Sequence, residues 1–178
     1  MNFCRNCGNA TNLIIPPGDN KKRDVCGKCN AIFYENPKII AGCLPVFDSK
    51  ILLCKRAIEP RVGLWTLPAG FMENNETCLE AALRESKEEA NIQIEEPVFC
   101  GLFDLPHISQ VYIFYSGTIL NGVFGAGIES LEVKLFKENE IPWKDLAFPV
   151  VEVMLRHHLK KMKKSDICTG TINRSWKK

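Results

Sequence analysis

Residues 70–92, GFMENNETCLEAALRESKEEANI, decide the fold of this chain and carry most of its candidate chemistry. Thr77 and Glu80 have the spacing of a capping box, so a helix is predicted from Thr77 to about Ala90. The side expected to face a sheet holds four small or apolar residues, Leu79, Leu83, Ser86 and Ala90. The opposite side is expected to hold three glutamates, Glu85, Glu88 and Glu89.

Carboxylates three and four positions apart are neighbours on a helix and repel one another. A hard divalent cation reverses that effect, because Mg²⁺ takes oxygen ligands of this kind. The segment therefore predicts a catalytic Mg²⁺ (or Mn²⁺) site, to which a backbone carbonyl at Gly70 can also reach. Arg84 and Glu76 are expected to pair and hold the loop against the helix. On the three glutamates alone, an exposed acidic helix without a metal is favoured over this site, and the spacing of the whole segment decides between them.

The spacing of the whole segment resembles the Nudix box: glycine, five residues, glutamate, seven residues, Arg-Glu, two residues and Glu-Glu. The pattern of this hydrolase superfamily falls on Gly70, Glu76, Arg84, Glu85, Glu88 and Glu89. Two positions depart from it, because Ser86 replaces an aliphatic residue and Asn91 replaces a glycine. Asparagine also ends helices in the left-handed conformation. Neither departure removes a catalytic group, so an active enzyme is expected.

Strands are expected on both sides of this segment, and the resemblance extends into them at 52–56, 63–70 and 129–136. The predicted strands are 38–47, 51–56, 92–94, 98–103, 110–120 and 131–136, and a final helix is predicted over 149–163. Strands before and after one mid-chain helix predict an α/β fold. The resemblance makes this a Nudix-type α/β/α sandwich with a mixed sheet, spanning residues 36–178.

The resemblance implies a pyrophosphatase that hydrolyses the diphosphate bond of FAD, ADP-ribose or NAD(H) and releases AMP. Glu85, Glu88 and Glu89 would hold the metal and act in catalysis. The proton of the attacking water would go to Glu89 or to a glutamate outside the helix, with Glu132 ranked above Glu129. Substrate contacts are expected from one guanidinium and three aromatic rings, Arg56, Trp65, Phe71 and Tyr112. A surface cation and buried core rings are the alternatives.

Residues 1–35 carry two Cys-x-x-Cys pairs, Cys4/Cys7 and Cys26/Cys29, with 18 residues between the inner cysteines. This spacing is typical of a structural Zn²⁺ site with four thiolates. Two disulfides or a redox dithiol are the alternatives. The segment is predicted to be a zinc ribbon that the metal folds. With it, nearly the whole chain is similar to Nudix hydrolases of the plant plastid FAD and ADP-ribose pyrophosphatase type.

Composition excludes several classes of protein. The 178 residues are 46% hydrophobic and 25% charged, as in an ordinary globular protein. The 23 basic and 21 acidic residues are nearly balanced, which argues against nucleic acid as a partner. The chain has no apolar run of membrane-spanning length and does not begin with a signal peptide, so a cytoplasmic enzyme with a nucleotide substrate is expected. A homodimer is expected by analogy alone.

Two other functions fit the same residues. One is a nucleotide-sensing regulator, in which a ribbon and a Nudix-like fold bind a nucleotide without cleaving it. The other is a Nudix enzyme acting on oxidised nucleoside triphosphates or capped RNA. A sensor has no need of Glu85, Glu88 and Glu89 together, and the products of hydrolysis separate triphosphate from dinucleotide substrates.

Overall fold

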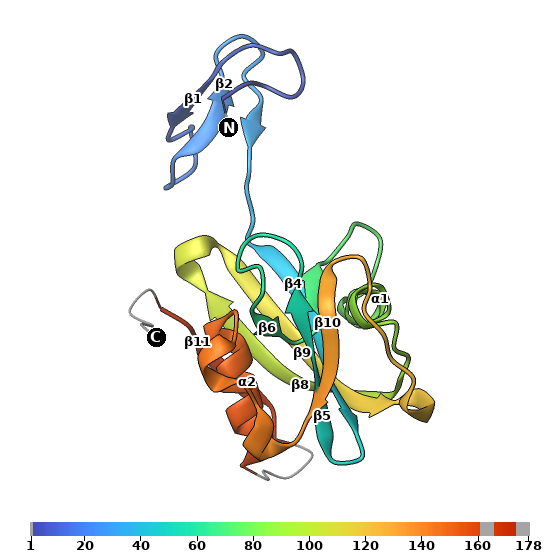
Figure 1. The fold of residues 1–178 in the computed structure, drawn as a ribbon. Helices are drawn as coiled ribbons and strands as arrows, with labels where there is room; N and C mark the ends of the chain where they lie inside the picture. The colour runs from blue at the N-terminus through green and yellow to red at the C-terminus, as the bar shows by residue number, and fades with distance from the viewer. Residues whose placement is uncertain (1, 161–165, 174–178) are drawn as a thin grey trace. The chain divides into compact units, whose positions relative to one another are not determined.

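The computed structural model describes residues 2–160 and 166–173. The chain forms two compact units, residues 1–36 and residues 37–178 (Figure 1). The first unit is called the ribbon below, and the second the body.

The ribbon is a small antiparallel sheet in the order β1-β2-β3. Its strands are β1 (Thr11–Ile14), β2 (Arg23–Cys26) and β3 (Ile32–Phe33). The charged first half of β2, Arg23-Asp24, has no strand pattern, so this strand is not evident from the sequence. Gly8 and Asn30, which follow the two cysteine pairs, both have positive φ, so each pair lies in a tight turn.

The body contains an eight-stranded mixed sheet, in the order β10-β5-β4-β9-β8-β11, with β6 on β5 and β7 on β4. The strands are β4 (Lys38–Phe47), β5 (Lys50–Arg56), β6 (Trp65–Thr66), β7 (Ala69–Phe71), β8 (Ile94–Leu105), β9 (Gln110–Ile119), β10 (Ser130–Phe136) and β11 (Cys168–Thr171). Two pairs are parallel, β4 with β9 and β8 with β11. The mixed sheet is therefore confirmed.

Two helices cover the two faces of this sheet, α1 (Cys78–Ala90) and α2 (Pro149–Leu159) (Figure 1). Four short 3-10 turns complete the body, η1 (Pro106–Ile108), η2 (Leu120–Gly122), η3 (Glu138–Glu140) and η4 (Trp143–Asp145). Successive residues of β5 point to opposite faces of the sheet. Leu52 packs with Ala90 of α1, whereas Leu53 packs with Leu155 of α2. The predicted α/β/α sandwich is confirmed.

Two sequence predictions differ from this fold. The segments 92–94 and 98–103 were taken as separate strands, but Ile94 and 98–103 belong to one strand, β8, whose register shifts twice along β9, and 92–93 precede it. Bulges hide a long strand because they break the period of two. The edge strand β11 was missed, and the end of the predicted second helix, 161–163, lies outside the described residues.

The faces of α1 also differ from the prediction. Its buried residues are Ala81, Ala82, Glu85, Ser86, Glu89 and Ala90. Of the three glutamates, Glu85 and Glu89 therefore lie on the inward side of the helix, and Glu88 faces outward. Small residues on the sheet side let the helix approach closely, and Ser86, a departure from the family pattern, bonds to the carbonyl of Ala82 at 2.7 Å.

Candidate active site

The local sequence builds both ends of α1 as predicted. Thr77 caps the first turn and completes the capping box with Glu80, with hydrogen bonds of 3.2 and 2.7 Å. Asn91 ends the helix in the left-handed conformation, at φ 52°. The capped helix then holds its carboxylates at fixed positions.

Arg84 connects the loop, strand β7 and the helix. Its guanidinium bonds both carboxylate oxygens of Glu76, at 2.8 and 3.0 Å, as predicted. It also donates to Glu85 at 2.7 Å, to Glu88 at 3.1 Å and to the carbonyl of Phe71 at 3.1 Å. This pairing lowers the pKa of Glu76 to about 2. One planar cation therefore orients three carboxylates at once.

Gly70 lies directly against Glu85. A Cβ at Gly70 would overlap the carboxylate of Glu85, so only glycine allows strand β7 and the helix to approach this closely. Burial raises the pKa of Glu85, although Arg84 opposes the effect. The expected close approach of backbone and carboxylate at Gly70 is present.

Glu89 is the most buried carboxylate of the site, with 6% of its surface exposed. Its Oε2 accepts a hydrogen bond from the backbone N–H of Ala69 at 3.3 Å, a contact that the sequence did not indicate. Burial first, and then the charge of Glu85, raises the pKa of Glu89 to about 8. The charge of Arg56 partly opposes this rise. Two buried carboxylates that repel each other form a site that a divalent cation would stabilise.

A further carboxylate, Glu129, lies in the loop before β10, and its charge acts on this pair. Glu129 raises the pKa of both Glu85 and Glu89 through its charge. Glu132, which the sequence ranked first, lies 3.9 Å from Lys55. Lys55 in turn lies over the ring of Trp65, which belongs to the core on the α2 side. Glu132 therefore faces away from α1, and its position does not support ranking it above Glu129.

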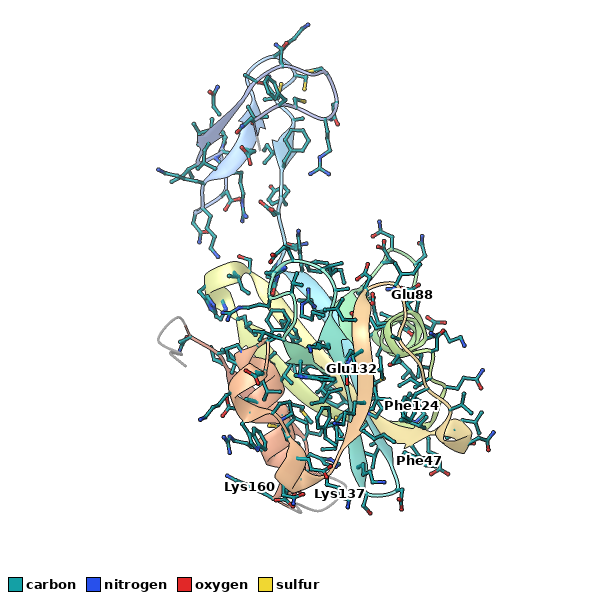
Figure 2. All side chains as sticks on the ribbon, in the orientation of Figure 1. Phe47, Glu88, Phe124, Glu132, Lys137 and Lys160 are labelled. Atoms are coloured by element: carbon teal, nitrogen blue, oxygen red, sulfur yellow. The ribbon has the colours of Figure 1, made fainter. Side chains whose placement is uncertain are left out.

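Glu132 and Glu88 can be located in Figure 2, on β10 and beside α1 respectively. The ranking failed because a bulge lies between Ser130 and Glu132, where two residues of β10 oppose one step along β5. A bulge changes which face the following side chains occupy, and the sequence of this strand does not reveal it.

Arg56 lies where its charge acts on both Glu89 and Tyr112. Its Nε donates to the carbonyl of Pro60 at 2.8 Å, and its guanidinium lies 5.1 Å from the ring centre of Phe148. These contacts fix the orientation of the guanidinium, a group whose shape matches phosphate oxygens.

The three aromatic candidates separate into core and surface. Trp65 and Tyr112 are each only 8% exposed and belong to the core on the α2 side. Neither ring presents an open face, which corrects the prediction that they stack on substrate. Phe71 is 48% exposed next to Gly70, with the ammonium of Lys38 5.2 Å from its ring centre. Phe71 is thus the candidate that is free to stack on a base.

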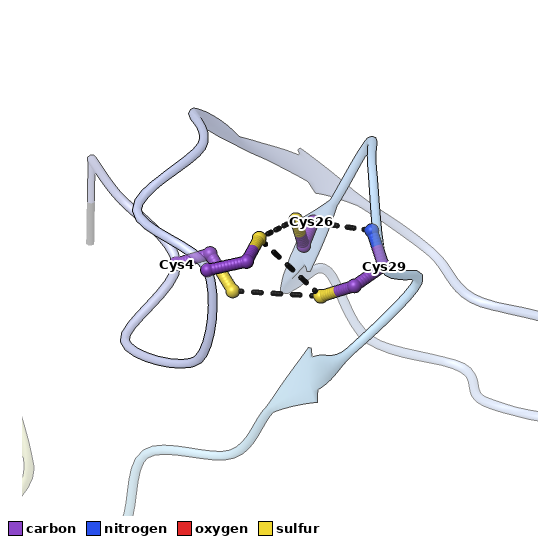
Figure 3. Close-up of side chains that lie close together, drawn as sticks. Cys4, Cys26 and Cys29 are labelled. Atoms are coloured by element: carbon purple, nitrogen blue, oxygen red, sulfur yellow. Dashed lines mark hydrogen bonds between the residues drawn. The ribbon is translucent and has the colours of Figure 1, made fainter.

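The four ribbon cysteines converge on one point. Their sulfur atoms all lie within 4.8 Å of one another, and Figure 3 shows those of Cys4, Cys26 and Cys29 turned inward. The Cys4–Cys29 and Cys7–Cys26 sulfur separations are 3.6 and 3.5 Å, far longer than a disulfide bond. All nine cysteines are free, which excludes the two-disulfide alternative.

Backbone amides support these thiols. The N–H groups of Cys29 and Lys28 donate to the sulfur of Cys26 at 3.5 and 3.4 Å, and they lower the pKa of that thiol to about 6. The amide of Asn6 bonds to Cys4 in the same way at 3.4 Å. Four thiols held this close together match the donor set of a tetrahedral metal site.

Family models match both units of the chain. A model described as the NUDIX domain matches residues 36–156, and a zinc-ribbon model described as Nudix N-terminal matches residues 2–35. The chain belongs to the Nudix hydrolases. In this Nudix hydrolase, the box residues are the ones that form the acidic site described above.

The chain is similar to a solved Nudix structure and to two enzymes. A crystal structure of a NUDIX hydrolase from Nitrosomonas europaea is 49% identical, with a TM-score of 0.92 over 98% of this chain and 100% of that one. An ADP-ribose pyrophosphatase of Methanocaldococcus jannaschii is 33% identical over 61% of this chain and 67% of its own length. The NAD-capped RNA hydrolase NudC of Vibrio atlanticus is 34% identical over 57% of this chain, which spans only 36% of NudC.

Neither helix among the described residues has the length and apolar composition needed to cross a membrane.

Proposed function

We propose that this Nudix hydrolase is a divalent-metal-dependent pyrophosphatase that cleaves the diphosphate bond of ADP-ribose or a similar dinucleotide, such as FAD or NAD(H), and releases AMP. The observation that carries the proposal is the pair of buried carboxylates, Glu85 and Glu89, next to Gly70 and under the charge of Glu129. The similarity to an ADP-ribose pyrophosphatase supports the substrate class.

The donor set fits a hard cation. Glu85, Glu88 and Glu89 offer carboxylate oxygens, and Gly70 offers a backbone carbonyl, which are the ligand types that Mg²⁺ or Mn²⁺ prefers. When bound there, the cation neutralises the diphosphate and lowers the pKa of a water molecule. Arg84 orients Glu85 and Glu88 through its ion pairs, so these two proposed ligands are held in position before a metal binds.

The residues around this set supply the remaining chemistry. Water attacks one phosphorus, the bond from that phosphorus to the bridging oxygen breaks, and Glu129 accepts the proton of the water. Arg56 binds the phosphate oxygens, and Phe71 stacks on a base. From ADP-ribose the products are AMP and ribose 5-phosphate. Positioning and charge neutralisation provide most of the rate in such phosphoryl transfers.

In the ribbon, we propose that Cys4, Cys7, Cys26 and Cys29 bind one structural Zn²⁺. The convergence of their sulfurs supports this proposal. The zinc content of the purified protein, measured by atomic emission, tests it, with one Zn²⁺ per chain expected.

A substrate panel tests the proposed reaction. ADP-ribose, FAD, NADH, an oxidised nucleoside triphosphate and an NAD-capped RNA are each incubated with Mg²⁺ or Mn²⁺, and the products are separated by chromatography. AMP from a dinucleotide supports the proposal. Pyrophosphate from the triphosphate, or preferential decapping of the RNA, would assign another Nudix substrate. Binding of a dinucleotide without turnover would assign a sensor instead.

A further inference from the structure

The segment between η2 and β10 runs alongside α1 (Figure 1). It is tied to the carboxyl end of the helix by two backbone hydrogen bonds, from Gly125 to the carbonyl of Ala90 at 2.9 Å and from Gly127 to the carbonyl of Glu89 at 3.0 Å. The last carbonyls of a helix have no partner within the helix. Here a distant loop supplies partners for two of them.

The side chain of Asn91 strengthens this attachment. Its Nδ2 donates to the carbonyls of Gly125 and Ala126, at 3.3 and 3.2 Å. The left-handed backbone at Asn91 is one that glycine adopts at less cost. A glycine would keep the helix end and lose both side-chain contacts. The departure from the family pattern at this position therefore adds an interaction.

Gly127 fits closely against the helix. A Cβ at Gly127 would overlap the carbonyl oxygen of Glu88, so any side chain here must move the loop or the helix. Gly125, two residues earlier, has open space around the corresponding position. Neither glycine has a positive φ, so the two positions are compared by the space that each leaves for a side chain.

Glu129 follows Gly127 by two residues, and two backbone hydrogen bonds fix this part of the loop. The amide of Ser130 bonds to the carbonyl of Gly127 at 3.1 Å, and the amide of Ala57 bonds to the carbonyl of Glu129 at 2.9 Å. The backbone of Glu129 is thereby held between Gly127 and strand β5. The contact at Gly127 is thus two residues from the carboxylate whose charge acts on Glu85 and Glu89.

We propose that Asn91 and Gly127 are positioning residues that hold the loop of Glu129 against the catalytic helix and so place this carboxylate for proton transfer. The proposal rests on the proposed function, since it assigns Glu129 a part in that reaction. A misplacement of about 1 Å at a reacting group can cost about 10²-fold in rate.

The first test compares two alanine variants of the same loop. Gly127→Ala is expected to lower kcat for Mg²⁺-dependent ADP-ribose hydrolysis by roughly 10–100-fold, with KM changed less than about threefold. Gly125→Ala is the matched control and should stay within about twofold of the wild type in both constants. Equal kcat values for the two variants would overturn the proposal.

The second test asks whether the effect acts through Glu129. Asn91→Gly should lower kcat by a few-fold, and Glu129→Gln should lower it by roughly 10²-fold or more. In the Glu129→Gln background, Gly127→Ala and Asn91→Gly should cost little more, because a residue that acts through another is non-additive with it. Losses that multiply fully in the double variants would show a general structural role and overturn the proposal.

Hydrogen exchange separates this proposal from the proposed function. The amides of Gly125 and Gly127 should be protected in the wild type and should exchange faster in Asn91→Gly, whether or not any dinucleotide is hydrolysed. If the wild type cleaves none of the substrates, the proposed function fails while the attachment of the loop is still measured. Unprotected amides in an active wild-type enzyme would overturn the positioning role alone.

Discussion

In the ribbon, four cysteines come together from two short turns, whereas the acidic site of the body combines a helix, strand β7 and the distant loop of Glu129. The sulfurs converge within 4.8 Å through local backbone geometry. In contrast, Glu85 and Glu88 share hydrogen bonds from one arginine, and Glu89 is buried and accepts a hydrogen bond from Ala69. A closed structural metal site can be encoded locally, but a site that must also admit water and substrate depends on the packing of several elements.

The largest expected effect tests the dependence of the ribbon on its metal. Cys26→Ser removes one of four thiolates, and zinc binding contributes roughly 10–16 kcal/mol in small domains of this kind. We expect hydrogen-exchange protection to be lost across residues 11–33, while α1 stays protected. Cys78→Ser, a free thiol of the body, is the control and should keep the ribbon folded. If the ribbon keeps its hydrogen-exchange protection without zinc, its folding does not depend on the metal.

The next effect concerns the acidic site of the body, where a substitution should remove activity and leave the fold intact. Glu89→Gln keeps the shape of the side chain and removes a proposed metal ligand. Hydrolysis should fall by roughly 10²–10³-fold, with a circular dichroism spectrum and a Tm close to those of the wild type. Glu73→Gln, exposed in the preceding loop, should leave kcat nearly unchanged. Full activity in Glu89→Gln would contradict a catalytic acidic site.

Acid unfolding tests how much the Glu76–Arg84 ion pair stabilises the body. Its pKa is lowered from 4.5 to about 2 by Arg84, so the ionised form is favoured in the folded state. The stabilisation is therefore complete above about pH 4.5 and is lost as the pH falls toward 2. Urea unfolding of the Glu76→Gln variant should accordingly depend less on pH in this window than that of the wild type. Identical pH dependence would show that the pair does not stabilise the fold.

The smallest expected effect concerns the helix cap. Thr77→Ala removes the hydroxyl that accepts a hydrogen bond from Glu80, and should lower the free energy of unfolding by about 1 kcal/mol. Thr77→Asp keeps a capping oxygen and should restore most of the loss. Denaturant unfolding followed by tryptophan fluorescence measures both variants, and equal stability in all three proteins would contradict the cap.

Local patterns were read correctly where neighbouring residues decide the structure. The β4 strand was predicted with the observed ends, Lys38 and Phe47, and the cap at Thr77 and the left-handed Asn91 were also confirmed. The same is true of the Glu76–Arg84 pair, whose partners lie in one short segment. Strand β11 was missed because it pairs with β8, far away in the chain.

The sequence alone therefore determined the family, the metal-binding motifs and the capped helix, because these depend on spacing within a few turns of backbone. Only the tertiary structure showed that Glu85 and Glu89 face inward, that Trp65 and Tyr112 belong to the core, and that Glu132 lies beside Lys55 on the side away from α1. The physical reason is that burial and charge at a site come from elements that are distant in sequence. A bulge in β10 or the space beside Gly127 arises only when those elements pack together.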